Sequence, residues 1–233
     1  MLSNERHRQI ISYLEKKNTV TVQELTDILY ASSSTIRRDL SELEAQGFVM
    51  RIHGGAVLTA GSTFDTPASL RRTQQLAEKQ RIAELASQFL KPSSTYFFDS
   101  SSTASILATR LSDYPDVKIA TNGVAILSNM QSTDKLSILS TGGYLRSPWD
   151  ELTGNLAIKC IENMNADVFF FSCAGFTVEQ GAMELSDDNV AVKRVFYRNS
   201  KLRILLCDST KIGKLFFFNS FSIPEIDYII EFI

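Results

Sequence analysis

Six short apolar runs constrain the fold of this 233-residue chain more than any other feature of its sequence. Each run is too short for a buried helix, and most are separated from the next by an amphipathic helical stretch. Strands with two buried faces are typical of parallel sheets that helices cover on both sides. The pattern therefore predicts an α/β fold with a mostly parallel sheet. The runs are residues 95–99, 117–121, 135–141, 167–173, 202–208 and 227–232, and the helical stretches are 103–113, 123–130, 154–164 and 189–199.

The start of the chain follows a different pattern, in which three amphipathic helices precede a pair of strands. Residues 4–17 carry apolar side chains at helical spacing, and Thr21 with Glu24 forms a capping box before a second helix. A short polar turn leads into a third helix, which ends at Gly47. Residues 48–58 then indicate a strand, a Gly-Gly turn and a strand. This order predicts a winged helix-turn-helix.

The third predicted helix has the two faces of a DNA-recognition helix. Ile36, Leu40 and Leu43 form an apolar stripe that packs inward. The opposite face carries hydroxyls, which permit close approach to phosphate, and arginines, which reach phosphates or guanine edges in the major groove. The net charge of −2 gives no sign of a nucleic-acid partner. The alternative is therefore a helix whose charged face is simply exposed to solvent. That face holds Ser34, Thr35, Arg37, Arg38 and Ser41, and Arg51 and His53 are expected at the tip of the wing.

The loops that follow the predicted strands carry hydroxyl-bearing and glycine residues. In parallel sheets ligands bind beyond the carboxyl ends of the strands. Ordinary capped loops would explain each loop alone. Together with nearby cations, however, the loops favour a small anionic ligand with many hydroxyl groups, such as a phosphorylated sugar. The candidate effector-binding residues are Asp99, Ser100, Ser101, Ser102, Thr103, Thr121, Asn122, Gly142, Gly143, Arg146, Lys193, Asp208 and Lys211.

These segments resemble one known family. S-S-S-T-I-R-R-D-L-S-E-L-E-A-Q-G followed by R-I-H-G-G-A looks like the signature of DeoR-type bacterial transcriptional regulators. D-S-S-S-T, T-N-G, G-G-Y-L-R, V-K-R and D-S-T-K-I-G resemble the sensor domain of that family, which is similar in fold to ribose-5-phosphate isomerase. The resemblance implies a repressor of a carbohydrate-metabolism operon that binds a double-stranded DNA operator and is controlled by a phosphorylated sugar.

The same resemblance assigns roles to individual residues. It implies that Asp39 holds neighbouring arginines and does not itself touch DNA. The residues that it places on DNA are Ser33, Ser34, Thr35, Arg37 and Arg38 in the helix, with Arg51 and His53 on the wing.

Composition changes along the chain suggest where its domains begin and end. We expect a DNA-binding domain at 1–58, a linker at 59–75 and an effector-sensing α/β domain at 76–233. A helical pattern extends from 70 to 90 across the end of that linker. Recognition of symmetric half-sites predicts a homodimer or homotetramer. The aromatic run 216–218 and Phe221 are expected in the core, and a partner surface in a domain that serves only for dimerisation is the alternative.

An active sugar-phosphate isomerase with a DNA-binding appendage is the competing interpretation. Aldose–ketose isomerisation needs a carboxylate base beside the carbon that loses its proton. The loop after the fourth strand has no acidic residue from 172 to 178. Glu184, Asp187 and Asp188 suit a solvated loop and a helix N-terminus, and Asp99 and Asp208 suit loop-orienting roles. We therefore expect no catalytic residue and no enzyme activity.

The remaining features predict neither a metal site nor a cofactor. The two histidines are isolated in the sequence, and the three cysteines are widely spaced without a C-x-x-C motif. No apolar run reaches the roughly 18 residues that span a bilayer. The N-terminal residues are polar and lack a signal-peptide core. We therefore expect a soluble, cytoplasmic protein without membrane contact.

Overall fold

In the computed structural model the chain forms two compact units, Met1–Leu70 and Arg71–Ile233. The structure describes residues 3–17, 19–45, 48–58, 68–146 and 149–231. Most of the expected linker, 59–67, lies outside the described residues. No helix within these described ranges has the length and apolar character needed to cross a bilayer.

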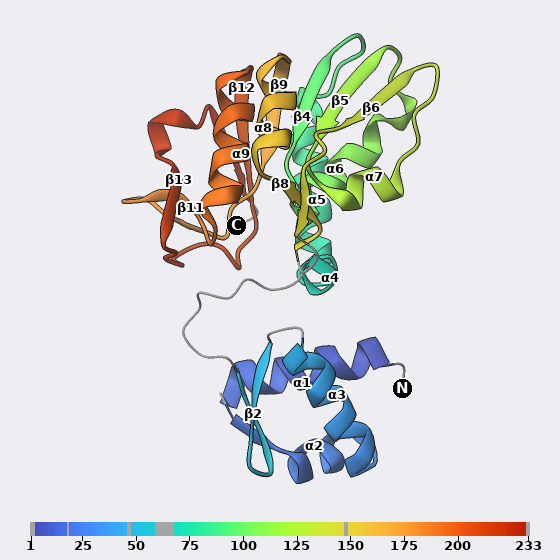
Figure 1. Ribbon diagram of the computed structural model, residues 1–233, viewed down its shortest axis with the longest axis vertical. Coiled ribbons are helices and arrows are strands. Elements are labelled where there is room, and N and C mark those ends of the chain that lie inside the picture. Colours follow the sequence, from blue (N-terminus) through green and yellow to red (C-terminus); the bar gives the residue numbers. More distant parts are fainter. Residues whose placement is uncertain (1–2, 18, 46–47, 59–67, 147–148, 232–233) are drawn as a thin grey trace. The chain divides into compact units, whose positions relative to one another are not determined.

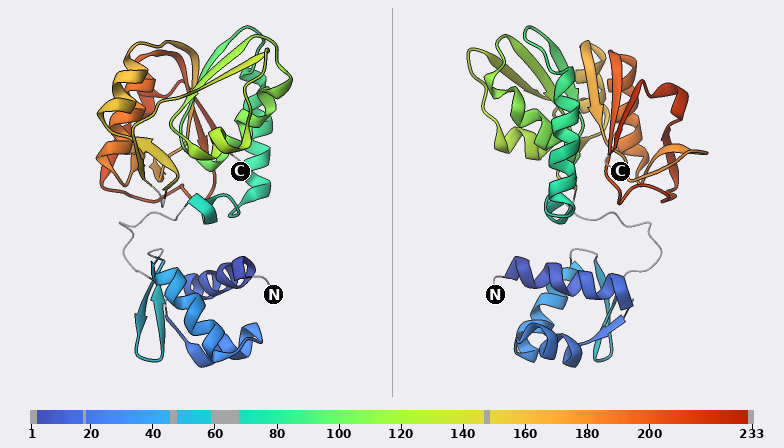
Figure 2. Two further views of the ribbon diagram at one scale, coloured as in Figure 1. Left: turned by 45° about the vertical axis from the view of Figure 1, so that its right-hand side comes forward. Right: turned by 180° about the vertical axis from the view of Figure 1, so that it is seen from behind.

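The first unit has the predicted order of three helices and a small sheet. Thr21 caps the second helix through the predicted capping box with Glu24, and a core cluster that includes Ile10, Leu25 and Leu40 joins the helices to the strands. The three strands form an antiparallel sheet in the order β1-β3-β2, and the β2–β3 hairpin stands beside the helices (Figure 2). The elements are α1 (Ser3–Lys17), β1 (Thr19–Thr21), α2 (Val22–Leu29), α3 (Ser33–Ala45), β2 (Val49–Ile52) and β3 (Gly55–Leu58).

The second unit is built on a six-stranded sheet in which every neighbouring pair is parallel. The strand order is β14-β12-β9-β4-β5-β6 (Figure 1). All six strands coincide with the six apolar runs, so the predicted parallel α/β fold is confirmed. The strands are β4 (Thr95–Phe98), β5 (Val117–Thr121), β6 (Leu136–Ser140), β9 (Ala166–Phe171), β12 (Ser200–Cys207) and β14 (Tyr228–Glu231).

Alternate residues of the central strands belong to two separate cores, one on each face of the sheet. Phe98 and Phe170 pack with α5, α6 and α7, whereas Phe97 and Phe169 pack with α8 and α9. Because both faces are buried, successive residues of a strand must all be apolar. This double burial explains why the strands appear as continuous runs in the sequence. The helices are α5 (Leu76–Ala86), α6 (Ser102–Thr109), α7 (Val124–Asn129), α8 (Asn155–Glu162) and α9 (Asp187–Arg198).

Two small antiparallel sheets were not predicted. One is the hairpin of β7 (Tyr144–Arg146) and β8 (Glu151–Thr153). The other has the order β10-β11-β13, formed by β10 (Gly175–Thr177), β11 (Gly181–Glu184) and β13 (Phe218–Phe221). Phe221 is fully buried, so its predicted place in the core is confirmed. The same prediction is wrong for Phe217 of the aromatic run, which is 81% exposed.

The prediction of one helical stretch at 70–90 is wrong, because the segment is divided into α4 (Ala68–Arg71), α5 and a final 3-10 turn at Ser87–Phe89. Gln75 has a φ of 49°, outside the helical region. The buried ammonium of Lys79 lies 2.5 Å from the carbonyl of Arg71 and 2.8 Å from that of Gln74. These bonds satisfy carbonyl groups that a continuous helix would have used internally. The last residues of the expected linker, 71–75, therefore fold with the second unit.

One buried ion pair fastens the third helix of the first unit to the first. The Nε and Nη2 atoms of Arg6 on α1 donate to the two carboxylate oxygens of Asp39 on α3, at 2.6 and 2.9 Å. Bidentate pairs of this kind are stronger than neutral hydrogen bonds and fix the relative orientation of the two groups. Asp39 thus sets how α3 lies against α1.

Asp39→Asn should lower the free energy of unfolding by about 2–3 kcal/mol, because Arg6 loses a buried counter-charge and a bidentate contact. Urea denaturation followed by far-ultraviolet circular dichroism measures this change. Glu5→Gln, which removes a half-exposed pair with Arg8 at 3.5 Å, is the control and should change the value by less than about 0.5 kcal/mol. If both substitutions lower the free energy of unfolding equally, the Arg6–Asp39 pair stabilises the protein no more than an exposed ion pair does.

Candidate DNA-binding surface and effector site

The N-terminus of α3 carries a cluster of hydroxyl groups. Ser32 is the capping residue, because its Oγ accepts a hydrogen bond from the backbone N–H of Thr35 at 3.2 Å. The same Oγ lies 2.9 Å from Ser34 Oγ and 2.8 Å from Thr35 Oγ1. Ser33, which follows the cap, is exposed and opens the helix. Ser33, Ser34 and Thr35 therefore lie together where the first-turn N–H groups of α3 point outward.

The two arginines of α3 project from its exposed face, whereas Ile36 and Leu40 are buried. The side chain of Arg38 is 83% exposed and makes a loose ion pair with Glu42, with Nε to Oε1 at 3.3 Å. Arg37 is also exposed. Such a pair in water contributes little to stability, so Arg38 is available to another partner.

The wing residues differ from each other in position. Arg51 lies within β2, and its Nη1 donates to Ser41 Oγ on α3 at 2.7 Å, while its backbone N–H donates to Glu44 at 2.9 Å. Arg51 pairs with Ala56, next to the Ile52–Gly55 pair that closes the turn, so it lies near the tip of the wing while its side chain is directed back to α3. His53 occupies the turn of the hairpin and is exposed, as expected.

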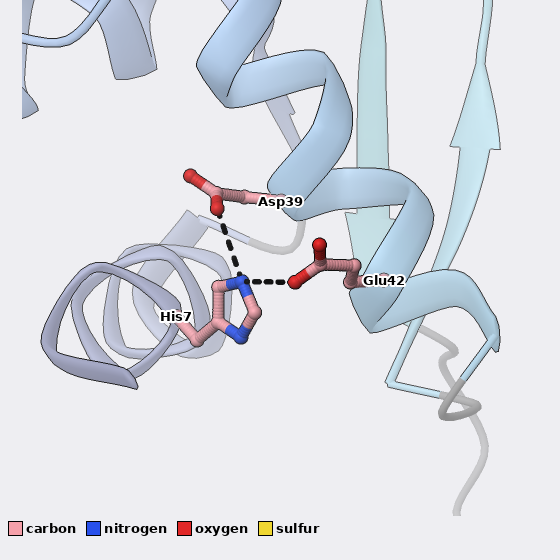
Figure 3. A group of neighbouring side chains, drawn as sticks. All are labelled: His7, Asp39 and Glu42. Carbon is pink, nitrogen blue, oxygen red and sulfur yellow. Dashed lines mark hydrogen bonds and ion pairs between the residues drawn. The ribbon is translucent and has the colours of Figure 1, made fainter. Parts of the chain in front are cut away.

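Asp39 is buried beneath the arginine-bearing face and holds an arginine, but a different one from those expected. Its partner is Arg6 of α1, not Arg37 or Arg38. Figure 3 shows that His7 also joins this group, with Nε2 at 3.1 Å from Asp39 and 3.5 Å from Glu42. His7, isolated in the sequence, thus lies beside two carboxylates in the fold. Ligand atoms of these three residues lie within 4.8 Å of one another. Arg6 already donates to both oxygens of Asp39, so we interpret the group as a structural ion-pair network.

The candidate effector residues of the second unit do gather at one edge of the main sheet. Because all six strands are parallel, the loops after β12, β9, β4, β5 and β6 follow one another along that edge in the order of the strands. Asp208, Asp99, Thr121, Asn122 and the Gly142–Gly143 pair occupy these loops. Gly143 is required there: a Cβ atom would lie 2.3 Å from the carbonyl oxygen of Thr153.

Lys193 forms the buried centre of this edge. Its ammonium lies 3.0 Å from Asp99 Oδ2, 2.5 Å from Glu184 Oε1 and 2.7 Å from the carbonyl oxygen of Ser172. Burial alone would lower the pKa of Lys193, but the carboxylates of Glu184 and Asp99 outweigh it and raise the pKa above its ordinary value. The three N–H groups of Lys193 are thus directed at protein acceptors.

Glu184 was expected in a solvated loop, and that expectation is wrong. It lies in β11, is 7% exposed and pairs with Lys193. A four-residue strand gives too little periodicity for its buried position to be read from the sequence.

A second buried carboxylate, Glu151 on β8, was missed entirely. Its Oε2 accepts hydrogen bonds from the Oγ of Ser100 at 3.3 Å and from the amide of Asn189 on α9. Arg146 Nη1 lies 3.5 Å from Oε1, and its guanidinium also lies 4.4 Å above the ring of Trp149. Burial raises the pKa of Glu151, although Asn189 and Arg146 oppose the shift.

The loop after β12 is tied to the first helices of the second unit. Glu78 on α5 accepts hydrogen bonds from the backbone N–H and the hydroxyl of Ser209, at 2.5 and 2.8 Å. Burial lowers the pKa of the neighbouring Lys79 to about 8, and the charge of Asp208 only partly opposes this. Arg72 pairs with Asp150 in the hairpin loop at 2.8 Å. The loop after β12 and the β7–β8 hairpin loop are therefore both held to residues 72–78, near the start of the second unit.

Several candidate residues shape the loops from within. Thr103 and Thr121 are buried, and Thr121 Oγ1 accepts the backbone N–H of Gly123 at 2.9 Å. Ser101 caps α6 by accepting the N–H of Ala104 at 3.2 Å. Ser102 begins that helix, and Lys211 lies at the half-exposed turn after Asp208. Ser100, Asn122 and Arg146 lie closest to Glu151, whereas Lys211 belongs to the other end of the edge.

Lys193→Met should lower the free energy of unfolding by about 3–5 kcal/mol, because it removes the charge that neutralises two buried carboxylates. Since folding raises the pKa of Lys193, its stabilisation is fully present below the ordinary lysine value of about 10.4 and is lost only as the pH rises beyond it. Urea denaturation at neutral pH tests the effect. Lys201→Met, which removes an 80%-exposed lysine paired with Asp167, is the matched control, and similar midpoints for the two variants would count against the central role of Lys193.

Known proteins match the chain over nearly its full length. The DeoR-like helix-turn-helix domain matches residues 6–61 and the DeoR C terminal sensor domain matches 74–231. The HTH-type transcriptional regulator GolR of Listeria innocua is 35% identical over 91% of this chain and 84% of its own length. The glycerol-3-phosphate regulon repressor of Escherichia coli is 30% identical over 97% of this chain and 90% of its own.

Among solved structures, ribose 5-phosphate isomerase A from Methanocaldococcus jannaschii matches with 14% identity and a TM-score of 0.41. The match covers 58% of this chain and 54% of that enzyme, so it spans about half of the isomerase. The two family matches and the full-length relatives identify the chain itself: it belongs to the DeoR family and is a DeoR-type transcriptional regulator.

Proposed function

We propose that the protein represses a carbohydrate-metabolism operon by binding its operator and that a phosphorylated sugar controls this binding. The observation that carries the DNA-binding part is the exposed pair Arg37 and Arg38 on a helix whose other face is buried. The proposal that a phosphorylated sugar controls DNA binding is supported by the name of one relative, a glycerol-3-phosphate regulon repressor. The effector edge of the second unit supplies the groups that such a ligand needs.

On DNA, α3 lies in the major groove with its hydroxyl-bearing N-terminus near a phosphate. Ser33, Ser34 and Thr35 approach the backbone, and Arg37 and Arg38 reach base edges or phosphates. His53 contacts the backbone or minor groove from the turn of the wing, and Arg51 steadies the wing against α3. The protein acts as a homodimer or homotetramer, because two recognition helices match half-sites about 34 Å apart.

In the second unit, the phosphorylated sugar binds at the carboxyl edge of the sheet. The first turn of α6, with Ser100–Thr103, supplies N–H and hydroxyl groups for the phosphate. Asn122, the Gly142–Gly143 turn and Arg146 surround the same loop, and Asp208 with Lys211 flanks it on the other side. Asp99 and Lys193 hold the loops in place through their buried pair.

Binding changes DNA affinity through the segment that begins the second unit. Arg72 and Glu78 join this segment to the hairpin loop and to the loop after β12. A ligand that shifts either loop therefore acts on residues directly following the DNA-binding unit in the chain. Thermodynamic linkage then makes the two affinities depend on each other.

The site supports sensing better than catalysis. An isomerase needs a carboxylate base that is free to take a proton from carbon. Asp99 and Glu184 are both held by Lys193, and Glu151 is held by Asn189 and Arg146. Asp208 Oδ1 accepts the N–H of Thr210 at 3.1 Å, and its Oδ2 is buried without a partner among the described residues. We therefore propose that the protein is not an enzyme and uses no cofactor.

Arg37→Ala and Arg38→Ala should each weaken specific DNA binding by about 1–3 kcal/mol if they read bases. The probe is a duplex selected by the wild-type protein from a randomised pool, and fluorescence anisotropy measures the affinity. Arg8→Ala, an exposed arginine of α1 that pairs with Glu5, is the control and should bind almost normally. Unchanged affinity in both α3 variants would remove the recognition role from this helix.

A panel of phosphorylated sugars should contain at least one compound that raises the thermal unfolding temperature at low concentration, because a ligand of the folded state stabilises it by mass action. The same compound should release the selected duplex in the anisotropy assay. A compound that stabilises the protein but leaves its DNA affinity unchanged would argue against control by that sugar.

A further inference from the structure

Three buried residues that carry hydrogen-bond acceptors are linked through β8 of the β7–β8 hairpin, and they come from three different elements. Glu151 belongs to β8, Asn122 follows β5 and Asn189 lies in the first turns of α9. All three residues are at most 8% exposed. The hairpin joins them, since Leu152 N–H donates to Asn122 O at 2.8 Å and Asn189 donates to Glu151.

Both asparagine side chains have a fixed orientation that leaves an acceptor unused. Asn122 Nδ2 donates to the carbonyl of Leu152 at 3.2 Å, and Asn189 Nδ2 donates to the carboxylate of Glu151. Each partner accepts hydrogen bonds, so the amide nitrogen must face it. The Oδ1 atoms of Asn122 and Asn189 are buried and have no hydrogen-bond partner among the residues that the structure describes. Native structures rarely bury acceptors in this state unless another molecule supplies the donor.

The charges around the cluster favour a neutral donor. Arg146 lies 3.5 Å from Glu151, and the charges of Arg71 and Lys193 also act on that carboxylate. The negative charge is thus already balanced, and an added ammonium group would be repelled by these cations. A phosphate oxygen would be repelled by the Glu151 carboxylate and could not supply a proton to the Oδ1 atoms of Asn122 and Asn189. Hydroxyl groups supply donors without adding charge.

The anionic end of a ligand has a separate place beside this cluster. Ser100 Oγ, 3.3 Å from Glu151, directly precedes the N-terminus of α6. The N–H groups of Ser102 and Thr103 in the first turn have no acceptor within the helix and attract an anion. The two ends of the site therefore differ in chemistry, with donors at α6 and acceptors at Glu151.

We propose that Glu151, Asn122 and Asn189 form a hydroxyl-reading subsite, which binds the sugar or polyol portion of a phosphorylated ligand whose phosphate lies at the first turn of α6. The proposal rests on the effector site described under the proposed function and names the groups that determine its specificity. A site built to hydrogen-bond hydroxyl groups rejects analogues that lack them, because its own buried acceptors then stay unpaired.

The test measures binding of five probes to the full-length protein by isothermal titration calorimetry: glycerol 3-phosphate, fructose 1-phosphate, glucose 6-phosphate, glucosamine 6-phosphate and inorganic phosphate. The wild type should bind at least one of the three hydroxyl-only esters at least about tenfold more tightly than inorganic phosphate. Glu151→Gln keeps the size of the side chain and should reduce this preference to within about threefold. Its affinity for inorganic phosphate should not fall, because the substitution removes a negative charge beside the phosphate position.

Two further variants complete the experiment. Asn189→Ala removes one unused acceptor and should also reduce the preference, which keeps the proposal testable if Glu151→Gln does not fold. Asp188→Asn removes an exposed acidic neighbour of Arg146, 4.0 Å away, and should leave the preference unchanged.

Four results would overturn the subsite. The first is a wild type that binds no hydroxyl-only ester more tightly than inorganic phosphate, and the second is a wild type that binds glucosamine 6-phosphate more tightly than every hydroxyl-only ester. The third is that Glu151→Gln and Asn189→Ala both keep the full preference for the ester over inorganic phosphate. The fourth is that these variants lose inorganic phosphate binding as much as they lose ester binding. The assay of Arg37 and Arg38 on DNA uses no sugar, so a failure of the subsite is separable from a failure of operator binding.

Discussion

The buried ammonium of Lys193 is the interaction on which the second unit depends most. A charge with so little solvent contact is tolerated only where opposite charges and hydrogen bonds replace water. Asp99, Glu184 and Ser172 provide these, and they come from the loop after β4, from β11 and from the loop after β9. Asp99 Oδ2 also accepts the backbone N–H of Ser172 at 3.0 Å. The ammonium of Lys193 therefore links the loops after β4 and β9, at the carboxyl ends of the main-sheet strands, to β11.

This arrangement also separates the tasks of the charged residues. The carboxylates of Asp99 and Glu184 are occupied by the buried ammonium of Lys193. Glu151 lies outside that group, and the Oδ1 atoms of Asn122 and Asn189 have no partner among the described residues. The edge is thus divided into a structural half around Lys193 and a half whose hydrogen-bonding capacity is not exhausted by the protein. That division fits a domain that recognises a small molecule without transforming it.

The sequence predicted the main sheet well because both faces of each strand are buried, so that neighbours such as Phe97 and Phe98 must both be apolar. It also predicted the stripe of Ile36, Leu40 and Leu43, which follows directly from helical spacing. It did not predict the short strands of the two small antiparallel sheets, since their pairing depends on distant segments and they have no run of apolar residues. Glu151 and Glu184 lie in such strands, and each acquires its partners only in the folded chain. The break before α5 was missed for the same reason, because Lys79 stabilises it through carbonyls that a sequence pattern does not reveal.

The Arg6–Asp39 pair has a consequence for how this protein can change. Asp39 faces inward and orients α3, whereas Arg37 and Arg38 face outward and contribute little to packing. The residues that pack α3 and the residues that form its exposed face are therefore different residues of one helix. Substitutions at the outer positions leave the packing of α3 intact, so under the proposed function they can alter the DNA sequence that is recognised while the scaffold persists.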